Sequence, residues 1–197
     1  HNAIPRDAAA VIALRKNQVE RTFGMMEETA AQLREEWQET EPDLKVTLAA
    51  VTEASCERVM SQECTQKVLD FVSALPHGVY RISAQSDGAI QTSSNLAQVK
   101  VDEKGLLQVV TSQRGFLASS LDNLTGKIEA TGRLAGARVA RANAYPAWPP
   151  QRDSELLKVC RKLYEQQAGK AAKVEVVHAG LECGVIGEKF PGMDMIS

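Results

Sequence analysis

The 197-residue sequence lacks an excess of charge of either sign, a long apolar run and a basic leader. Its formal net charge is -2, which argues against a nucleic-acid-binding module, because such modules normally carry a basic excess. No apolar run reaches the length of about 18 residues that a membrane span requires, and no basic-then-apolar signal opens the chain. Hydrophobic residues nevertheless make up 44% of the sequence, so a core can be buried.

Metal-ligand and nucleophile patterns are also scarce. The four Cys form no CxxC pair, which is typical of reduced thiols in a cytoplasmic protein. His178 and Cys183 could share a metal, but a structural zinc site takes four ligands, so the residue pattern predicts no metal site. HxxEH, GxSxG and a Gly-rich phosphate loop are absent. The local motifs therefore assign no nucleophile and base, and a triad assembled only by the fold is the remaining alternative.

Apolar spacing predicts an α+β fold, with helices packed on a mostly antiparallel sheet and an α/β fragment at the C-terminal end. The first helix carries one apolar stripe from Val19 to Trp37, and Asp102–Gly105 is the turn of a predicted hairpin. Asp153 is placed to cap a helix whose buried face runs from Leu156 to Tyr164. Further helices are expected within 54–75, over 117–135 with an apolar stripe from Leu117 to Leu134, and after Gly180. Strands are expected over 8–14, 44–48, 97–101, 106–112, 137–142, 174–177 and 193–197.

Three polar residues stand out as candidates for ligand binding. Arg114 ends a predicted strand, where its planar guanidinium could meet a carboxylate, or could equally be a surface or ion-paired Arg. Asn2 could present its amide to a ligand or cap a turn. Glu182 lies in a Gly-rich stretch that lets a ligand approach the backbone, or that forms a tight turn into a helix.

Five motifs, in order along nearly the whole chain, resemble the bacterial aminoacyl-histidine dipeptidases, which are carnosine-splitting, zinc-dependent peptidases. They are the stretches Asn2–Ala8, Leu134–Ala137, Ala144–Trp148, His178–Gly184 and Pro191–Met195. In that family an α/β catalytic domain holds two zinc ions bridged by water, and an inserted lid domain closes over the substrate. The family's zinc ligands have no match in this sequence, so the resemblance implies that this segment carries neither metal ligand nor catalytic residue. The ends at His1 and Ser197 lack polar tails, which indicates a piece of a longer protein.

The resemblance implies a domain organisation and roles for individual residues. Residues 1–52 would be part of a first, ferredoxin-like lid subdomain, residues 53–148 a second one, and residues 149–197 a segment of the catalytic domain. Asn2 would help to hold the substrate, and Arg114 would clamp its C-terminal carboxylate. Simpler family members place that arginine at the position of Arg15. Dipeptidases of this branch have two lid subdomains that mimic a dimer, so we favour Arg114, which comes from the second subdomain. Glu182 would line the substrate pocket.

We therefore expect a fragment of a cytoplasmic zinc-dependent dipeptidase that hydrolyses Xaa-His dipeptides. The fragment would contribute lid closure and carboxylate binding, would bind no zinc and would be inactive by itself. The expected partner is the Xaa-His dipeptide, with no nucleic acid and no membrane; a homodimer is compatible with exposed sheet edges. The alternative is a free-standing α+β binding or dimerisation module without catalysis.

Overall fold

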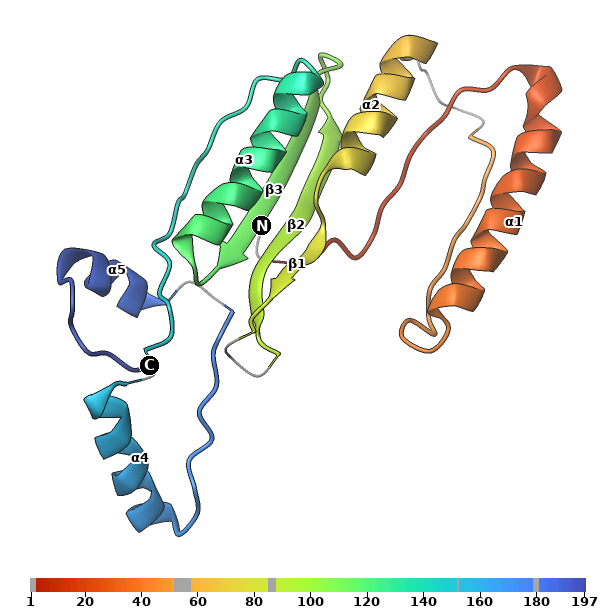
Figure 1. Ribbon diagram of the computed structural model, residues 1–197. Coiled ribbons are helices and arrows are strands. Elements are labelled where there is room, and N and C mark those ends of the chain that lie inside the picture. Colours follow the sequence, from red (N-terminus) through yellow and green to blue (C-terminus); the bar gives the residue numbers. More distant parts are fainter. Residues whose placement is uncertain (1–2, 52–57, 85–87, 152, 179–180) are drawn as a thin grey trace. The chain divides into compact units, whose positions relative to one another are not determined.

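The computed structural model describes residues 3–51, 58–84, 88–151, 153–178 and 181–197. The chain divides into two compact units: one is Ala8–Glu63, and the other combines His1–Asp7 with Cys64–Ser197 (Figure 1). The domain boundaries expected after residues 52 and 148 remain predictions. No helix in the described part of the chain is both long enough and apolar enough to cross a membrane.

The Ala8–Glu63 unit is built around helix α1, Val19–Trp37, which follows a short 3-10 turn, η1, Lys16–Gln18. The predicted helix is confirmed, but only Ala30 of its stripe is buried. After the helix, Leu44, Val46 and Leu48 are half-buried while the residues between them are exposed. The side chains of residues 44–48 therefore alternate in exposure as predicted, although these residues form no strand.

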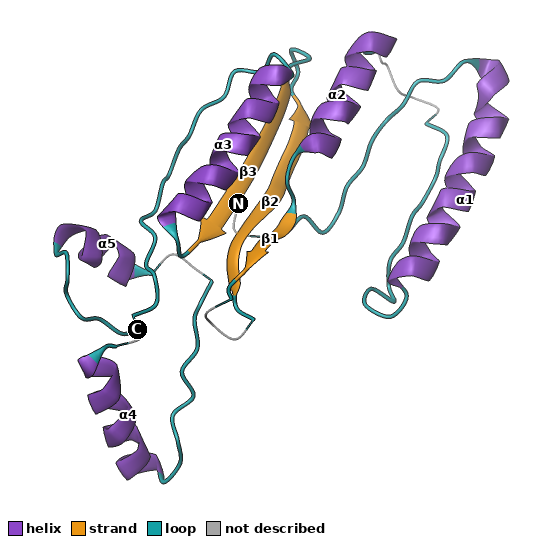
Figure 2. Cartoon of the chain, viewed as in Figure 1, coloured by secondary structure: helices purple, strands orange, loops and turns teal. Residues whose placement is uncertain are grey.

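The second unit contains a three-stranded antiparallel sheet with strand order β1-β2-β3, which confirms the α+β fold (Figure 2). The strands are β1, Gly78–Ile82, β2, Ile90–Val101, and β3, Leu107–Gly115. Helix α2, Gln62–Ala74, precedes the sheet and helix α3, Ala118–Leu134, follows it. The apolar spacing predicts both helices, and both are confirmed.

The core of this unit lies between the two helices and one face of the sheet. Leu124 and Ile128 of α3 and Leu75 at the end of α2 are buried. Partly buried residues from α2 and from all three strands pack against them, namely Phe71, Tyr80, Leu96 and Val109. Leu134, predicted to extend the buried stripe of α3, is instead 89% exposed, because the helix ends there and Gly136 follows with a φ of 74°.

The hairpin between β2 and β3 is confirmed, with residues 102–106 connecting the strands. The carboxylate of Asp102 accepts hydrogen bonds from the backbone N–H groups of Lys104 (2.9 Å) and Leu106 (2.8 Å). Gly105 adopts a φ of 77°, which glycine tolerates without strain. The connection is one residue longer than the four-residue loop expected from the sequence.

A bulge at Ala97 changes the phase of β2 relative to β3. Leu96 pairs with Thr111 and Gln98 pairs with Val110, so Ala97 is the extra residue on the bulged strand. Because side chains alternate along a strand, the face that Leu96 occupies before the bulge is taken by odd-numbered residues after it.

The C-terminal part contains helix α4, Glu155–Ala168, and helix α5, Glu182–Lys189. Both predicted helices are confirmed, and Gly169 ends α4 with a left-handed φ of 66°. The cap of α4 is Ser154, whose hydroxyl accepts a 2.9 Å hydrogen bond from the Leu157 N–H, so the expectation of Asp153 was wrong.

Five predicted strands do not form: residues 8–14, 44–48, 137–142, 174–177 and 193–197 lie in no strand. An extended segment becomes a strand only when a second segment satisfies its backbone hydrogen bonds, and the described residues supply no such partner to these five. The apolar face expected on α4 is likewise 40% to 55% exposed at Leu156, Val159, Leu163 and Tyr164. No residue of α4 is buried, and Cys160, predicted to pack, is half-buried.

Candidate carboxylate-binding site

Arg114 lies near the end of β3, where it pairs with Ser93 of β2. Thr92 and Ser94 are buried, and together with Leu96 they occupy the sheet face that carries the helices. Alternation along the strand therefore places Ser93, and its cross-strand neighbour Arg114, on the opposite face. This places a half-buried guanidinium on the face of the sheet away from the helical core.

His178 joins this face from the segment that precedes α5. Its Nε2 atom shares a 2.7 Å hydrogen bond with the hydroxyl of Ser93, and both side chains are partly buried. A serine hydroxyl can donate or accept, so the bond is compatible with more than one protonation state of the ring. The hydrogen bond brings the start of the His178–Gly184 motif to the strand pair that carries Arg114.

The surroundings of His178 favour the neutral ring. Burial lowers its pKa, and the positive charge of Arg114 lowers the pKa further. The backbone of Ile90 acts on the pKa in the opposite direction and is the smaller effect. Since the ordinary histidine value is about 6.5, the ring is mainly neutral at neutral pH.

The N-terminal motif reaches the same face. The side-chain amide of Asn95, two residues beyond Ser93 on β2, donates a 2.9 Å hydrogen bond to the backbone carbonyl of Ala3. The Oδ1 atom of Asn95 is buried and has no hydrogen-bond partner within the described ranges. Asn2, the predicted substrate-binding residue beside Ala3, lies outside the described residues.

Arg114 has no acidic partner in the described part of the chain. The ion pairs found there involve other residues, and no Asp or Glu side chain bonds to Arg114. A partly desolvated guanidinium gains most from a carboxylate, which it can meet with two parallel N–H bonds. The geometry therefore suits an anion supplied from outside these residues.

The resemblance also concerns Glu182 and, as the alternative to Arg114, Arg15. Glu182 is the first residue of α5, is exposed, and forms no hydrogen bond or ion pair with another described residue. Arg15 is exposed, precedes η1 and belongs to the Ala8–Glu63 unit. The expected role of Glu182 in substrate binding remains a prediction, as does the preference for Arg114 over Arg15.

Sequence reasoning missed Ser93, Asn95 and the role of His178 beside Arg114. The available signal was the polar run Thr92–Asn95 inside a strand, whose alternate residues had to face away from the core. From the residue pattern, His178 is a candidate only as a metal ligand together with Cys183. Cys183 is instead buried in α5, with its Sγ atom 3.9 Å from the carbonyl of Ile196.

No group of three or more His, Cys, Asp or Glu side chains able to hold a metal ion occurs in the ranges that the structure describes. A catalytic zinc site takes three protein ligands and a structural site takes four. The described residues therefore do not fit a zinc ion.

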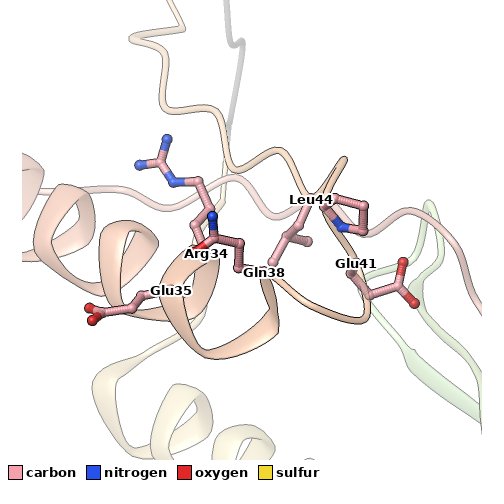
Figure 3. A pocket seen from close by; sticks show the side chains of 6 residues that line it. Arg34, Glu35, Gln38, Glu41 and Leu44 are labelled. Carbon is pink, nitrogen blue, oxygen red and sulfur yellow. The ribbon is translucent and has the colours of Figure 1, made fainter.

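The Ala8–Glu63 unit has a hollow of about 310 Å³ at the end of α1. It is lined by Arg34, Glu35, Gln38, Glu41, Pro42 and Leu44 (Figure 3). Figure 3 shows that the charged ends of Arg34, Glu35 and Glu41 point in different directions. Because these groups do not converge on one point, this hollow is a weaker candidate for a binding site than the sheet face that carries Arg114.

A second hollow, of about 400 Å³, lies beside α5 and is mainly apolar. It is lined in part by Pro146, Trp148, Gly184, Met193 and Met195. Gly184 is buried against the chain at Pro146, whose carbonyl oxygen is 2.5 Å from the position that a Cβ atom would take. The glycine is therefore needed for close packing of α5 against residues 146–148.

Along its whole length the chain is similar in sequence to a bacterial dipeptidase, and its structure matches part of the structure of another. No family model matches it. The resemblance drawn from the five sequence motifs is thereby confirmed.

Two relatives define this similarity. The cytosol non-specific dipeptidase of Escherichia coli K12 is 30% identical over 196 residues, which cover 100% of this chain and 40% of that protein. The crystal structure of aminoacylhistidine dipeptidase from Vibrio alginolyticus matches with a TM-score of 0.83 and 29% identity. That match covers 92% of this chain and 36% of the Vibrio chain. The chain thus spans about two-fifths of the length of the Escherichia coli dipeptidase.

Proposed function

We propose that this chain is the carboxylate-binding part of a zinc-dependent dipeptidase that hydrolyses Xaa-His dipeptides, and that it is inactive by itself. The names of both relatives support a dipeptidase, and the chain matches less than half of each. In this proposal residues 1–52 and 53–148 belong to the substrate-closing lid, and residues 149–197 belong to the catalytic domain. The parent enzyme is assigned to the cytoplasm.

The proposal rests on the half-buried position of Arg114 and on its lack of an acidic partner among the described residues. Every dipeptide has one C-terminal carboxylate, and a guanidinium binds such a group through two parallel N–H bonds. Arg114 is partly buried, lies on the polar face of the sheet and has no acidic partner among the residues that the structure describes. The nearby Asn95 Oδ1 atom is buried and accepts no hydrogen bond from another described residue.

The metal chemistry is assigned to the parent and not to this chain. Zinc would polarise the scissile carbonyl and activate a water molecule in a reaction of this class. Since the described residues contain no suitable ligand group, the proposal places the zinc ligands and the general base in other parts of the parent enzyme. This chain would bind and orient the carboxylate end of the substrate.

Steady-state kinetics of the full-length parent on a Xaa-His dipeptide test the proposal. Arg114→Ala should lower kcat/KM by about 30-fold to several-thousand-fold, because removing one partner of a desolvated charge pair costs about 2–5 kcal/mol. Arg114→Lys should also be impaired, since a lysine ammonium cannot form the two-pronged contact. If the contact also orients the scissile bond, kcat should fall as well as KM rise.

Arg15→Ala is the matched control, because it removes the same charge from an exposed position. Its kcat/KM should remain close to that of the wild type. A collapse for Arg15→Ala beside an unchanged value for Arg114→Ala would assign the carboxylate to the other arginine.

A further inference from the structure

Ser93 places two different side chains next to each other. Across the sheet it pairs with Arg114, and through its hydroxyl it bonds to His178 at 2.7 Å. Cross-strand neighbours have Cβ atoms about 4.5–5.5 Å apart, so the side chains of Arg114 and His178 both lie next to the same serine. His178 comes from a segment 85 residues further along the chain, so the fold and not local sequence creates this arrangement.

We propose that His178 is a positioning residue of the Arg114 site, held beside the guanidinium by Ser93, and that carboxylate binding at Arg114 is accompanied by proton uptake at His178. The proposal rests on the proposed function, because it needs an anion at Arg114. The contact with Ser93 and the register of β2 and β3 define the place of His178.

The direction of the coupling follows from the charges around the ring. In the free site, burial and the charge of Arg114 both lower the pKa of His178. Arg114 is the charged side chain whose field reaches the ring among the described residues. A bound carboxylate brings negative charge to that point and offsets the field of Arg114, so the pKa of His178 must rise on binding.

Binding and protonation are then linked. A ligand that raises the pKa of a group binds more tightly once the pH falls below the bound-state value, because the bound state takes up the proton first. Each unit of rise corresponds to about tenfold tighter binding below both pKa values. The affinity of the site for a carboxylate should therefore increase from pH of about 8 to pH of about 5, as long as the carboxylate itself stays ionised.

The partner of His178 suits this role. When the ring is neutral, the Ser93 hydroxyl can donate to Nε2; when the ring is charged, the same oxygen can accept from the Nε2–H. The hydrogen bond therefore survives the change of charge, and the ring keeps its place beside Arg114. Threonine would preserve this property, and alanine would remove it.

The test is an NMR titration of the histidine ring signals in the 197-residue chain, with N-acetylglycine as the probe. This probe has one carboxylate and no other group that titrates near neutral pH. In the free chain, Arg114→Gln should raise the pKa of His178, while Arg114→Lys should change it much less. Saturating N-acetylglycine should raise the pKa of His178 in the wild type but not in Arg114→Gln. His77, exposed and bonded to the Leu96 N–H, is the internal reference.

The serine variants separate positioning from simple proximity. Ser93→Ala should reduce the response of His178 to N-acetylglycine, and Ser93→Thr should restore it. Ser112→Ala, which removes a hydroxyl from a nearby position of β3, is the matched control and should leave the response intact. An equal response in Ser93→Ala and in the wild type would overturn the positioning role.

Further results would overturn the inference in different ways. If Arg114→Gln leaves the pKa of His178 unchanged in the free chain, the two side chains are not coupled. If N-acetylglycine shifts the Arg114 Nε–H signal but not the pKa of His178, the carboxylate site stands and only the proton coupling fails. If the probe shifts neither signal, both the carboxylate site and the inference fail.

Discussion

The carboxylate of Asp194 accepts a 2.9 Å hydrogen bond from the backbone N–H of Leu156, 38 residues earlier in the chain. Leu156 lies in the first turn of α4, where N–H groups have no partner within the helix. A negative charge at this end also complements the helix dipole. The Pro191–Met195 motif thus supplies a long-range cap for α4, in addition to the local cap from Ser154.

Asp194 should make the stability of the chain depend on pH in the acidic range. The N–H of Leu156, followed by the Ser154 hydroxyl, holds the pKa of Asp194 below its ordinary value. A carboxyl group whose folded-state pKa is depressed stabilises the fold above the unfolded value of about 3.9, and this contribution is lost as pH falls through the folded pKa. Thermal unfolding by circular dichroism at about pH 7 and about pH 3 should show a smaller acid-induced loss in Asp194→Asn than in the wild type. Parallel losses would contradict the role of Asp194, and the exposed Asp43→Asn should behave like the wild type.

The two residues before α4 should differ sharply in their effect on stability. Ser154→Ala removes the hydroxyl that accepts the Leu157 N–H and should lower the free energy of unfolding by about 1 kcal/mol. Asp153→Ala changes the exposed neighbour and should have a much smaller effect. Urea unfolding monitored by circular dichroism measures both. A larger loss for Asp153→Ala would restore the cap that the sequence alone indicated.

Gly184 should tolerate alanine poorly, although it lies in a helix. The added Cβ would meet the Pro146 carbonyl oxygen at 2.5 Å, so the backbone would have to move, at a cost of about 1–3 kcal/mol. Gly187 in the same helix is the control, because its nearest neighbour is the flexible end of Met195 at 3.0 Å. Urea unfolding should show Gly184→Ala destabilised and Gly187→Ala near neutral or slightly stabilised by the better helix propensity of alanine. Equal values would show that α5 is not packed against residue 146.

The sequence predicted elements whose signal is local. The apolar stripe from Val19 to Trp37 and the Asp102–Gly105 turn each depend on neighbours within a few residues, and both structures form. The strand expected at residues 8–14 depends on a pairing partner, which its own residues do not encode, and it does not form. Burial shows the same limit, since Leu124 is fully buried and Leu134, at the end of the same predicted stripe, is exposed.

The candidate site was predictable only in part for a related reason. Arg114 could be identified from the strand that precedes it, because charge and position at a strand end are local properties. Its pairing with Ser93 depends on the register of two strands, and the bond to His178 joins positions 85 residues apart. The resemblance indicated that the motifs at both ends of the chain concern the substrate, but not that Ala3 and His178 bond to neighbouring positions of β2.

Ala97, the extra residue of the β2 bulge, changes which residues of β2 face the helices. Upstream of it, even-numbered residues such as Leu96 face the helices; downstream, Val99 lies opposite Val109 of the core cluster. Without Ala97, Leu96 would still pair with Thr111 and Gln98 with Val110, now as consecutive residues of a regular ladder. Ser93 would keep Arg114 as its cross-strand neighbour and would stay on the face away from the helices. The residue numbers change parity at Ala97 but the two faces of the sheet do not, so a deletion at this one position should leave the candidate carboxylate site in place.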